Sequence, residues 1–319
     1  MKTAGIICEF NPFHKGHKYL IDSVRQDLEP DAVVCIMSGN FVQRGMPALW
    51  DKRERAKAAI NGGADLVIQM PVCVSLSSAE YFAKGAVDIA KAMDIDYLCF
   101  GSESGDIVYL TDLANNGINE IEYGNNILAC EYIRNLDGKI KPYTLKINDD
   151  LGHASDIRKD SVISFDNELF KLVQYAILSS DTEILKRAPE VSEGLENRIV
   201  SVITDAEDLN DLILKIKSKR YTYTRISRIL MQILLGIEKS VPDSIYAHIL
   251  AFNGVGQELL SSLKKSENIT LYSNISREDT EKRNDLALDV KSDDIYSIIT
   301  GRSIYEFSDY VCKPYKCNV

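Results

Sequence analysis

The sequence has 319 residues, of which 45% are hydrophobic and 26% are charged, and its formal net charge is −10. This composition is ordinary for a globular protein, and the length suits two domains. No apolar run reaches the roughly 18 residues of a membrane-spanning helix, and the N-terminus does not have the pattern of a signal peptide, so we expect a cytoplasmic protein. The acidic balance argues against indiscriminate nucleic-acid binding, although it allows a local basic face.

The first predicted element is a short apolar strand at residues 5–8, which leads into a polar turn and an amphipathic helix. His14 and His17 are three residues apart at the helix start, so they point the same way. Gly16 removes a side chain where another molecule could approach the backbone. Because the N–H groups of a helix start attract phosphate, we interpret the turn as a nucleotide phosphate site. The alternatives are a plain surface turn and half of a metal site.

Further strands and helices follow in alternation. Apolar runs predict strands at residues 31–37 and 64–70, and two further strands are predicted at residues 95–100 and 140–147. Helical composition is found at residues 52–61, 79–93 and 127–136. Alternating strands and helices predict a parallel sheet with right-handed crossovers. Ligands of such sheets bind beyond the carboxyl ends of the strands, so the residues just after each strand are the candidates for chemistry.

Several polar segments occupy such positions. Residues 38–48 are rich in glycine and amide side chains, which fits turn chemistry and a substrate role equally. Gly101 follows the fourth strand, where a nucleotide could approach the backbone, although a glycine can also simply end a strand. Asn125 precedes a helix and is either an N-cap or a ligand contact. Farther on, Ser155 is a candidate cap, and the guanidinium of Arg158 suits phosphate.

The second half of the chain has helical texture from about residue 161. Helices are predicted at residues 165–178, 194–202, 209–217, 223–235 and 245–250. A basic cluster with interleaved aromatics lies within it and comprises Lys215, Lys217, Lys219, Arg220, Arg225 and Arg228 with Tyr221 and Tyr223. Such a cluster suits RNA, through phosphate contacts and base stacking. The simpler interpretation is a solvated helix face with buried tyrosines.

The cysteines do not predict a disulfide framework. Five of the seven lie in or beside apolar segments, namely Cys8, Cys35, Cys73, Cys99 and Cys130. Free cysteine commonly behaves as a small buried hydrophobe. Cys312 and Cys317 are five residues apart without a second pair or a nearby histidine, which is weak evidence for zinc.

The turn Glu9-Phe10-Asn11-Pro12-Phe13-His14-Lys15-Gly16-His17 resembles the HxGH nucleotidyltransferase superfamily and, within it, the bacterial tRNA(Met) cytidine acetate ligase family. Similar stretches extend the resemblance over nearly the whole chain, at residues 38–48, 100–103, 154–159, 193–198, 220–226 and 289–296. Two departures are visible. Gly124 stands where the family has proline, and a Gly-Ala-Gly-Tyr-His segment of the family is missing after Lys146, in a chain shorter than typical members.

The resemblance implies an α/β fold: a Rossmann-like, parallel five-stranded nucleotidyltransferase sheet in residues 1–160, followed by a mainly α-helical, tRNA-binding C-terminal domain in residues 161–319. It implies an ATP-dependent ligase that forms acetyl-adenylate from acetate and acetylates N4 of the wobble cytidine of elongator tRNA(Met), with Mg²⁺ bridging the phosphates. Two alternatives remain: an enzyme that adenylylates a small phosphorylated metabolite, and a non-catalytic tRNA-binding relative.

The resemblance also implies roles for particular residues. His14 and His17 would be catalytic, and Arg158 would hold the departing pyrophosphate. The nucleotide contacts would come from Ile7, Glu9, Phe10, Asn11, His14, Gly16, His17, Leu20, Gly101, Asn125 and Arg158. No protein-bound metal is expected.

Overall fold

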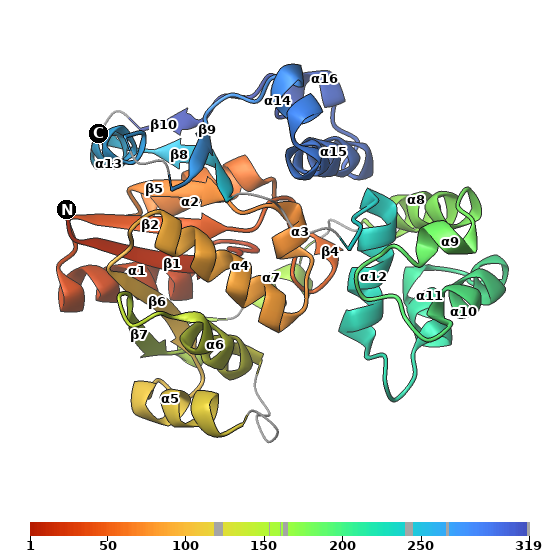
Figure 1. The fold of residues 1–319 in the computed structure, drawn as a ribbon, viewed down its shortest axis with the longest axis horizontal. Helices are drawn as coiled ribbons and strands as arrows, with labels where there is room; N and C mark the ends of the chain where they lie inside the picture. The colour runs from red at the N-terminus through yellow and green to blue at the C-terminus, as the bar shows by residue number, and fades with distance from the viewer. Residues whose placement is uncertain are drawn as a thin grey trace.

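The computed structural model describes residues 1–117, 124–152, 154–159, 161, 165–239, 245–265 and 268–317. Its centre is a sheet with the strand order β10-β8-β5-β2-β1-β6-β7, in which β9 also pairs with β8 (Figure 1). The five strands from β5 to β7 in this order run parallel and confirm the predicted sheet: β1 (Thr3–Cys8), β2 (Ala32–Met37), β5 (Leu66–Gln69), β6 (Tyr97–Ser102) and β7 (Lys141–Lys146).

Helices cover both faces of this sheet. One face packs against α1 (Lys15–Leu28) and α2 (Lys52–Asn61), and the other against α4 (Ala79–Ala92), α5 (Ile107–Asn116), α6 (Gly124–Asn135) and α13 (Gly254–Leu263). Successive strand residues face opposite sides of the sheet. Ile6 therefore packs in the apolar cluster under α1 and α2, and Ile7 packs in the cluster under α4. Burial of both faces explains why the inner strands β2 and β5 are nearly continuous apolar runs in the sequence, whereas β7, at the end of the strand order, is only partly buried.

A group of helices lies beside the sheet (Figure 1). It comprises α8 (Asp166–Leu178), α9 (Thr182–Leu185), α10 (Leu195–Val202), α11 (Leu209–Ile216) and α12 (Tyr223–Leu235). Its apolar core also receives side chains from the sheet side, among them Phe41 of the hairpin β3 (Phe41–Val42)–β4 (Met46–Pro47) and Val72 of α3 (Val72–Ser75). Between β7 and this group lie a 3-10 turn at Asp149–Leu151 and α7 (Ala154–Lys159).

The helix predicted at residues 245–250 is wrong, because this segment is β8 (Tyr246–Phe252). β8 pairs antiparallel with β5 and parallel with β9 (Thr270–Tyr272) and β10 (Tyr315–Lys316), so the chain returns to the sheet after α12. A short apolar run buried on both sides has no period that separates strand from helix. The described part of the chain then contains α14 (Arg277–Lys282), α15 (Asn284–Ile299) and α16 (Ile304–Phe307). The domain division near residue 160 stays a prediction.

Nowhere in the described ranges is there a helix with the length and apolar character needed to cross a membrane.

A buried network of charged side chains joins α2 to the C-terminal part of the chain. Lys52 Nζ lies 2.6 Å from Asp309 Oδ2 and 3.4 Å from Asp293 Oδ1. Arg53 Nη2 lies 2.6 Å from Asp309 Oδ1 and 2.9 Å from Asp293 Oδ2. The side chains of Lys52, Asp293 and Asp309 are at most 1% exposed. Asn40, in the loop after β2, donates from Nδ2 to Asp293 Oδ1 at 2.7 Å, so the network also anchors that loop.

His248 of β8 lies against this network as a neutral imidazole. Its Nδ1 is 3.7 Å from Asp309 Oδ1 and has no hydrogen-bond partner among the described residues. Burial, followed by the charges of Lys52 and Arg53, lowers the pKa of His248 well below its ordinary value. The unfolded chain binds a proton here near pH 6.5, whereas the folded chain does not. The contribution of His248 to the free energy of unfolding is therefore fully present above about pH 6.5. It is lost as the pH falls, because the unfolded chain then takes up a proton that the folded chain excludes.

We expect His248→Gln to be less sensitive to acid than the parent. The loss of unfolding free energy between pH 7.5 and pH 5.5 should be smaller by about 1.4 kcal/mol, because the variant lacks this one proton uptake on unfolding. Urea unfolding at both pH values measures the difference, and every other titrating group is common to the two proteins. Identical pH profiles would mean that folded His248 takes up the proton as readily as the unfolded chain.

Candidate active site

The turn after β1 fixes the tautomers of two imidazoles. His14 is the N-cap of α1, and its Nδ1 accepts a hydrogen bond from the backbone N–H of Gly16 at 3.0 Å. His17 Nδ1 accepts from the backbone N–H of His14 at 3.3 Å. An accepting Nδ1 carries no hydrogen, so each ring keeps its N–H at Nε2. The two ring centroids are 3.9 Å apart with the rings tilted by 42°, which places two neighbouring donors at the start of one helix.

His17 is a hydrogen-bond donor rather than a positive charge. Burial, followed by the charge of His14, lowers the pKa of His17 to about 3. Two aromatic rings contribute to this environment: the ring centroid of Phe10 lies 4.9 Å from that of His17, and the centroid of Phe13 lies 5.8 Å away. The imidazole is therefore neutral at physiological pH, and its Nε2–H can donate to an oxyanion at the positive end of the helix dipole.

Gly16 was predicted to let a ligand approach the backbone, and the structure shows a second reason for a glycine at this position. A Cβ built on Gly16 would lie only 2.8 Å from Cε1 of His14. Any larger residue would therefore displace the capping ring. The glycine serves the geometry of His14 directly, and its contact with a nucleotide stays a prediction.

Arg55 holds the turn from the α2 side, and the sequence did not predict this role. This α2 residue is fully buried, and its guanidinium donates to the carbonyls of Trp50, Glu9, Ser38 and Gly39. It therefore links the segments that leave the carboxyl ends of β1 and β2. The available signal was its helical spacing of four from Ala59, a buried residue on α2.

The second predicted motif meets the turn through Arg158. Its Nη1 on α7 donates to the backbone carbonyl of Asn11, whose own Oδ1 accepts from the N–H of Leu49 at 2.7 Å. Burial and then the positive charge of Arg44 lower the pKa of Arg158. The predicted contact residues Asn11 and Arg158 are thus brought together. The side chain of Ser155 lies outside the described residues.

Glu9 faces the same cations. Its Oε1 accepts from the backbone N–H of Gln43 at 2.8 Å. Burial raises the pKa of Glu9, while that hydrogen bond and the charges of Arg44, Arg55 and Arg158 oppose the rise. The carboxyl group therefore lies where positive charge from three elements converges.

Gly101 and Asn125 lie on the β6 side of β1. Ile6 pairs with Cys99, which places Gly101 level with the last residue of β1. Asn125 Nδ2 donates to Glu103 Oε1 at 2.9 Å, so its amide oxygen remains for another donor. Glu103, which the sequence analysis did not single out, also accepts from the backbone N–H of Asn126 at 2.8 Å. Glu103 thereby holds Asn125 in a fixed position at the start of α6.

Two predicted contact residues pack into the apolar clusters. Ile7 is buried in the cluster under α4, and Leu20 packs against the cluster under α1. Their predicted nucleotide contacts are not tested by this packing and stay a prediction.

The basic cluster of the helical part is largely paired with acidic side chains. Arg225 and Arg228 contact Glu190, Lys215 contacts Asp211, and Arg220 contacts Glu193. Tyr221 is buried, whereas Tyr223 is partly exposed. Pairing of this kind removes much of the positive field that RNA would require. The role of this cluster in RNA binding stays a prediction.

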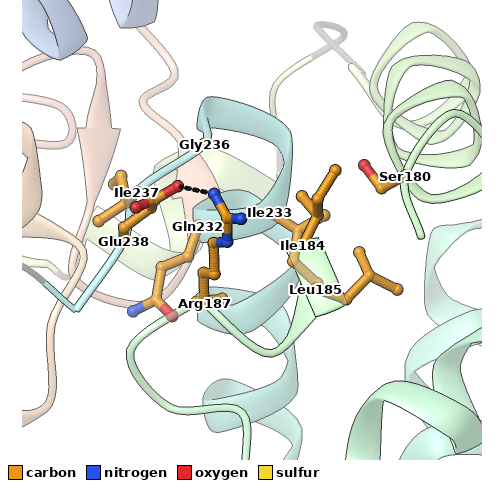
Figure 2. Close-up of a pocket in the computed structure, with 10 residues that line it drawn as sticks. Ser180, Ile184, Leu185, Arg187, Gln232, Ile233, Gly236, Ile237 and Glu238 are labelled. Carbon is orange, nitrogen blue, oxygen red and sulfur yellow. Dashed lines mark hydrogen bonds and ion pairs between the residues drawn. The ribbon is translucent and has the colours of Figure 1, made fainter. Parts of the chain in front are cut away.

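A pocket between α9 and the end of α12 is separate from the histidine turn. It is lined by apolar side chains such as Leu185 and Ile233, and Arg187 pairs with Glu238 across it at 3.4 Å (Figure 2). None of the predicted site residues lines this pocket.

The parallel sheet with paired imidazoles at the end of its central strand is that of a nucleotidyltransferase, and the model of the family HIGH Nucleotidyl Transferase matches residues 1–122 and 148–308. The tRNA(Met) cytidine acetate ligase of Clostridium perfringens is 34% identical, covering 98% of this chain and 99% of the relative. That of Staphylococcus haemolyticus is also 34% identical, covering 97% and 98%. The chain belongs to the tRNA(Met) cytidine acetate ligase family.

Solved structures agree with this assignment. Thermotoga maritima TmcAL, in its apo form and bound with alpha-thio ATP, matches with a TM-score of 0.88 and 25% identity, covering 100% of both chains. The alignment to the Clostridium perfringens relative spans 402 positions, more than the 319 residues of this chain. The relative therefore carries stretches that this chain lacks, which confirms the prediction of a shortened member. The position of the missing segment after Lys146 stays a prediction.

Proposed function

We propose that this protein activates acetate with ATP and transfers the acetyl group to N4 of the wobble cytidine of elongator tRNA(Met). The observation that carries the proposal is the pair of imidazoles at the start of α1, each of which accepts a backbone hydrogen bond at Nδ1 and so directs Nε2 outward as a donor. The relatives named tRNA(Met) cytidine acetate ligase support the acyl and RNA substrates, and the neighbour bound with alpha-thio ATP supports the nucleotide. A tRNA acceptor would be met in the cytoplasm, which supports the expected cytoplasmic location.

The first step joins acetate to the nucleotide. Acetate is already ionised at neutral pH, so no general base is needed. A carboxylate oxygen attacks the α-phosphorus of ATP, the bond to the β-phosphate oxygen breaks, and pyrophosphate leaves. His14 and His17 would donate from Nε2 to the phosphoryl oxygens, where negative charge develops in the transition state. Arg158 would bind the departing pyrophosphate, and the fixed amide of Asn125 with Gly101 would hold the nucleoside.

The second step forms the amide. The exocyclic amine of cytidine attacks the carbonyl carbon of acetyl-adenylate, loses one proton, and AMP leaves. The helical part would present the tRNA to the carboxyl edge of the sheet.

Mg²⁺ would enter with the nucleotide. The described ranges contain no group of three or more His, Cys, Asp or Glu side chains arranged to hold a metal ion. Mg²⁺ commonly binds through substrate phosphates and water with one or two carboxylates, and Glu9 would offer one carboxylate beside the histidine turn. The ion would neutralise charge on the phosphates.

Exchange of radiolabelled pyrophosphate into ATP tests the proposal before any RNA is added. Acetate-dependent exchange, followed by acetate-dependent acetylation of elongator tRNA(Met), is the expected result. Exchange that requires a phosphorylated metabolite in place of acetate would contradict the proposal in favour of metabolite adenylylation. Binding of tRNA without any exchange would contradict it in favour of a non-catalytic relative.

A further inference from the structure

The hairpin β3–β4 brings a single arginine to the active site. β2 pairs with β1 in parallel, with Met37 opposite Cys8, so both strands end at the same edge of the sheet. The hairpin follows directly after β2, and Arg44 occupies its tip between Val42 and Met46. Gln43, the residue before Arg44, donates its backbone N–H to Glu9 Oε1 at 2.8 Å. The tip is therefore attached to the first residue after β1.

The other side of the same tip is fixed to α12. Gly45 has a φ of +77°, and a Cβ built on it would lie 2.3 Å from the backbone nitrogen of Arg228. Its carbonyl accepts a hydrogen bond from Ser227 Oγ at 2.7 Å. The backbone is held on both sides of Arg44. Binding of a ligand by the Arg44 side chain therefore does not require the backbone to become ordered, which lowers the entropic cost of binding.

Arg44 differs from the arginines around it because its charge is not paired. Its side chain is exposed and forms no hydrogen bond or ion pair within the described part of the chain. Arg53 and Arg228, by contrast, each contact carboxylates. The charge of Arg44 opposes the rise that burial causes in the pKa of Glu9, and it adds to the lowering of the pKa of Arg158. Three arginines, Arg44, Arg55 and Arg158, thus act on the one carboxyl group of Glu9, which leaves local positive charge on a protein of net charge −10.

We propose that Arg44 contacts an anionic substrate group of the adenylation step, namely the carboxylate of the acyl substrate or the polyphosphate of ATP. This inference rests on the proposed function. The predicted nucleoside contacts, Gly101 and Asn125, lie on the β6 side of β1, whereas the hairpin that carries Arg44 follows β2, on the other side of β1, and is bonded to Glu9. The group it meets is therefore a reacting anion rather than the base or the ribose. A guanidinium fork suits either a carboxylate or a phosphate.

Steady-state pyrophosphate exchange with Arg44→Met tests this contact without RNA. We expect kcat/KM to fall at least about tenfold, because the variant loses a charge-assisted hydrogen bond. A raised KM for acetate alone would assign the carboxylate, and a raised KM for ATP would assign the polyphosphate. Arg44→Lys should recover part of the loss, since it keeps the charge but not the fork.

Arg187→Met is the matched control. Arg187 is an exposed arginine of the helical part whose exposed ion pair with Glu238 is visible in Figure 2. The control should exchange within twofold of the parent, and unchanged urea midpoints would show that each variant is folded. Unaltered exchange by Arg44→Met would overturn the proposal, and a simultaneous loss of tRNA acetylation would reassign Arg44 to the RNA.

Calorimetric binding of ATP and of pyrophosphate separates this proposal from the proposed function. A parent protein without acetate-dependent exchange would contradict the function. In that event the contact with an acyl carboxylate falls with the function, weaker binding of ATP or pyrophosphate by Arg44→Met would still support the polyphosphate contact, and unchanged binding would overturn the proposal.

Discussion

Replacement of His17 by alanine is expected to lower acetate-dependent exchange of pyrophosphate into ATP by about 100- to 1,000-fold, the usual effect of removing one preorganised donor to a developing oxyanion. The variant loses the Nε2–H that the hydrogen bond from the His14 backbone leaves free to act. It also loses the acceptor for that backbone group, so the turn itself is expected to loosen. Initial rates at saturating ATP and acetate measure the loss.

The pH dependence sharpens this test. The pKa of His17 is about 3, so its imidazole does not titrate between pH 6 and pH 8. The ratio of parent to His17→Ala rates should therefore be constant over that range. Asp22→Ala is a suitable control, because it removes only an exposed ion pair with Lys18 on the same helix. Normal exchange by His17→Ala, or a ratio that follows a titration near pH 6.5, would contradict the assigned role.

The largest effect on stability is expected for Lys52→Met. This change leaves Asp293 and Asp309 buried with Arg53 as their remaining cation. Breaking a buried charge pair from one side typically costs about 3–5 kcal/mol of unfolding free energy, because the carboxylates lose a partner but stay out of water. Urea unfolding at pH 7.5 measures the loss.

A surface pair provides the control for Lys52→Met. Lys282 is 70% exposed and pairs with Glu278 one helical turn away, so Lys282→Met should cost less than about 0.5 kcal/mol. The double variant Lys52→Met/Asp309→Asn should be less destabilised than the sum of its single changes, since each partner is costly only while the other stays charged. Equal losses for Lys52→Met and Lys282→Met would show that the buried network contributes no more than a surface pair.

The sequence predicted the elements that depend on local pattern. Apolar runs identified the inner parallel strands such as β2 and β5, because strands buried on both faces have no polar side. The histidine turn was accessible for a similar reason: its strand, glycine and helix start are consecutive residues. β8 was mistaken for a helix because its pairing with β5 is set by residues about 180 positions away rather than by its own period.

Partners distant in sequence account for what was missed at the site. In the sequence, Arg55 has the character of a solvent-facing helix residue. In the structure, its guanidinium donates to the carbonyls of Glu9 and Gly39, which belong to distant segments. The basic cluster around Arg225 and Arg228 suggested RNA, but the carboxylate of Glu190, more than 30 residues earlier, lies against both. Pattern gives the position of a charge along an element, whereas its neutralisation depends on tertiary contacts.

The return of the chain to the sheet has a consequence for synthesis on the ribosome. The closest partner of the Lys52 ammonium group is Asp309, which is synthesised 257 residues later. Asn40, in the loop after β2, likewise donates its hydrogen bond to Asp293, a residue of the last part of the chain. Closing contacts of such long range is slow, because most of the chain must be ordered first. The nascent N-terminal sheet would therefore leave the exit tunnel with unmatched charges and an open β5 edge, and we expect it to depend on chaperones until the last strands arrive.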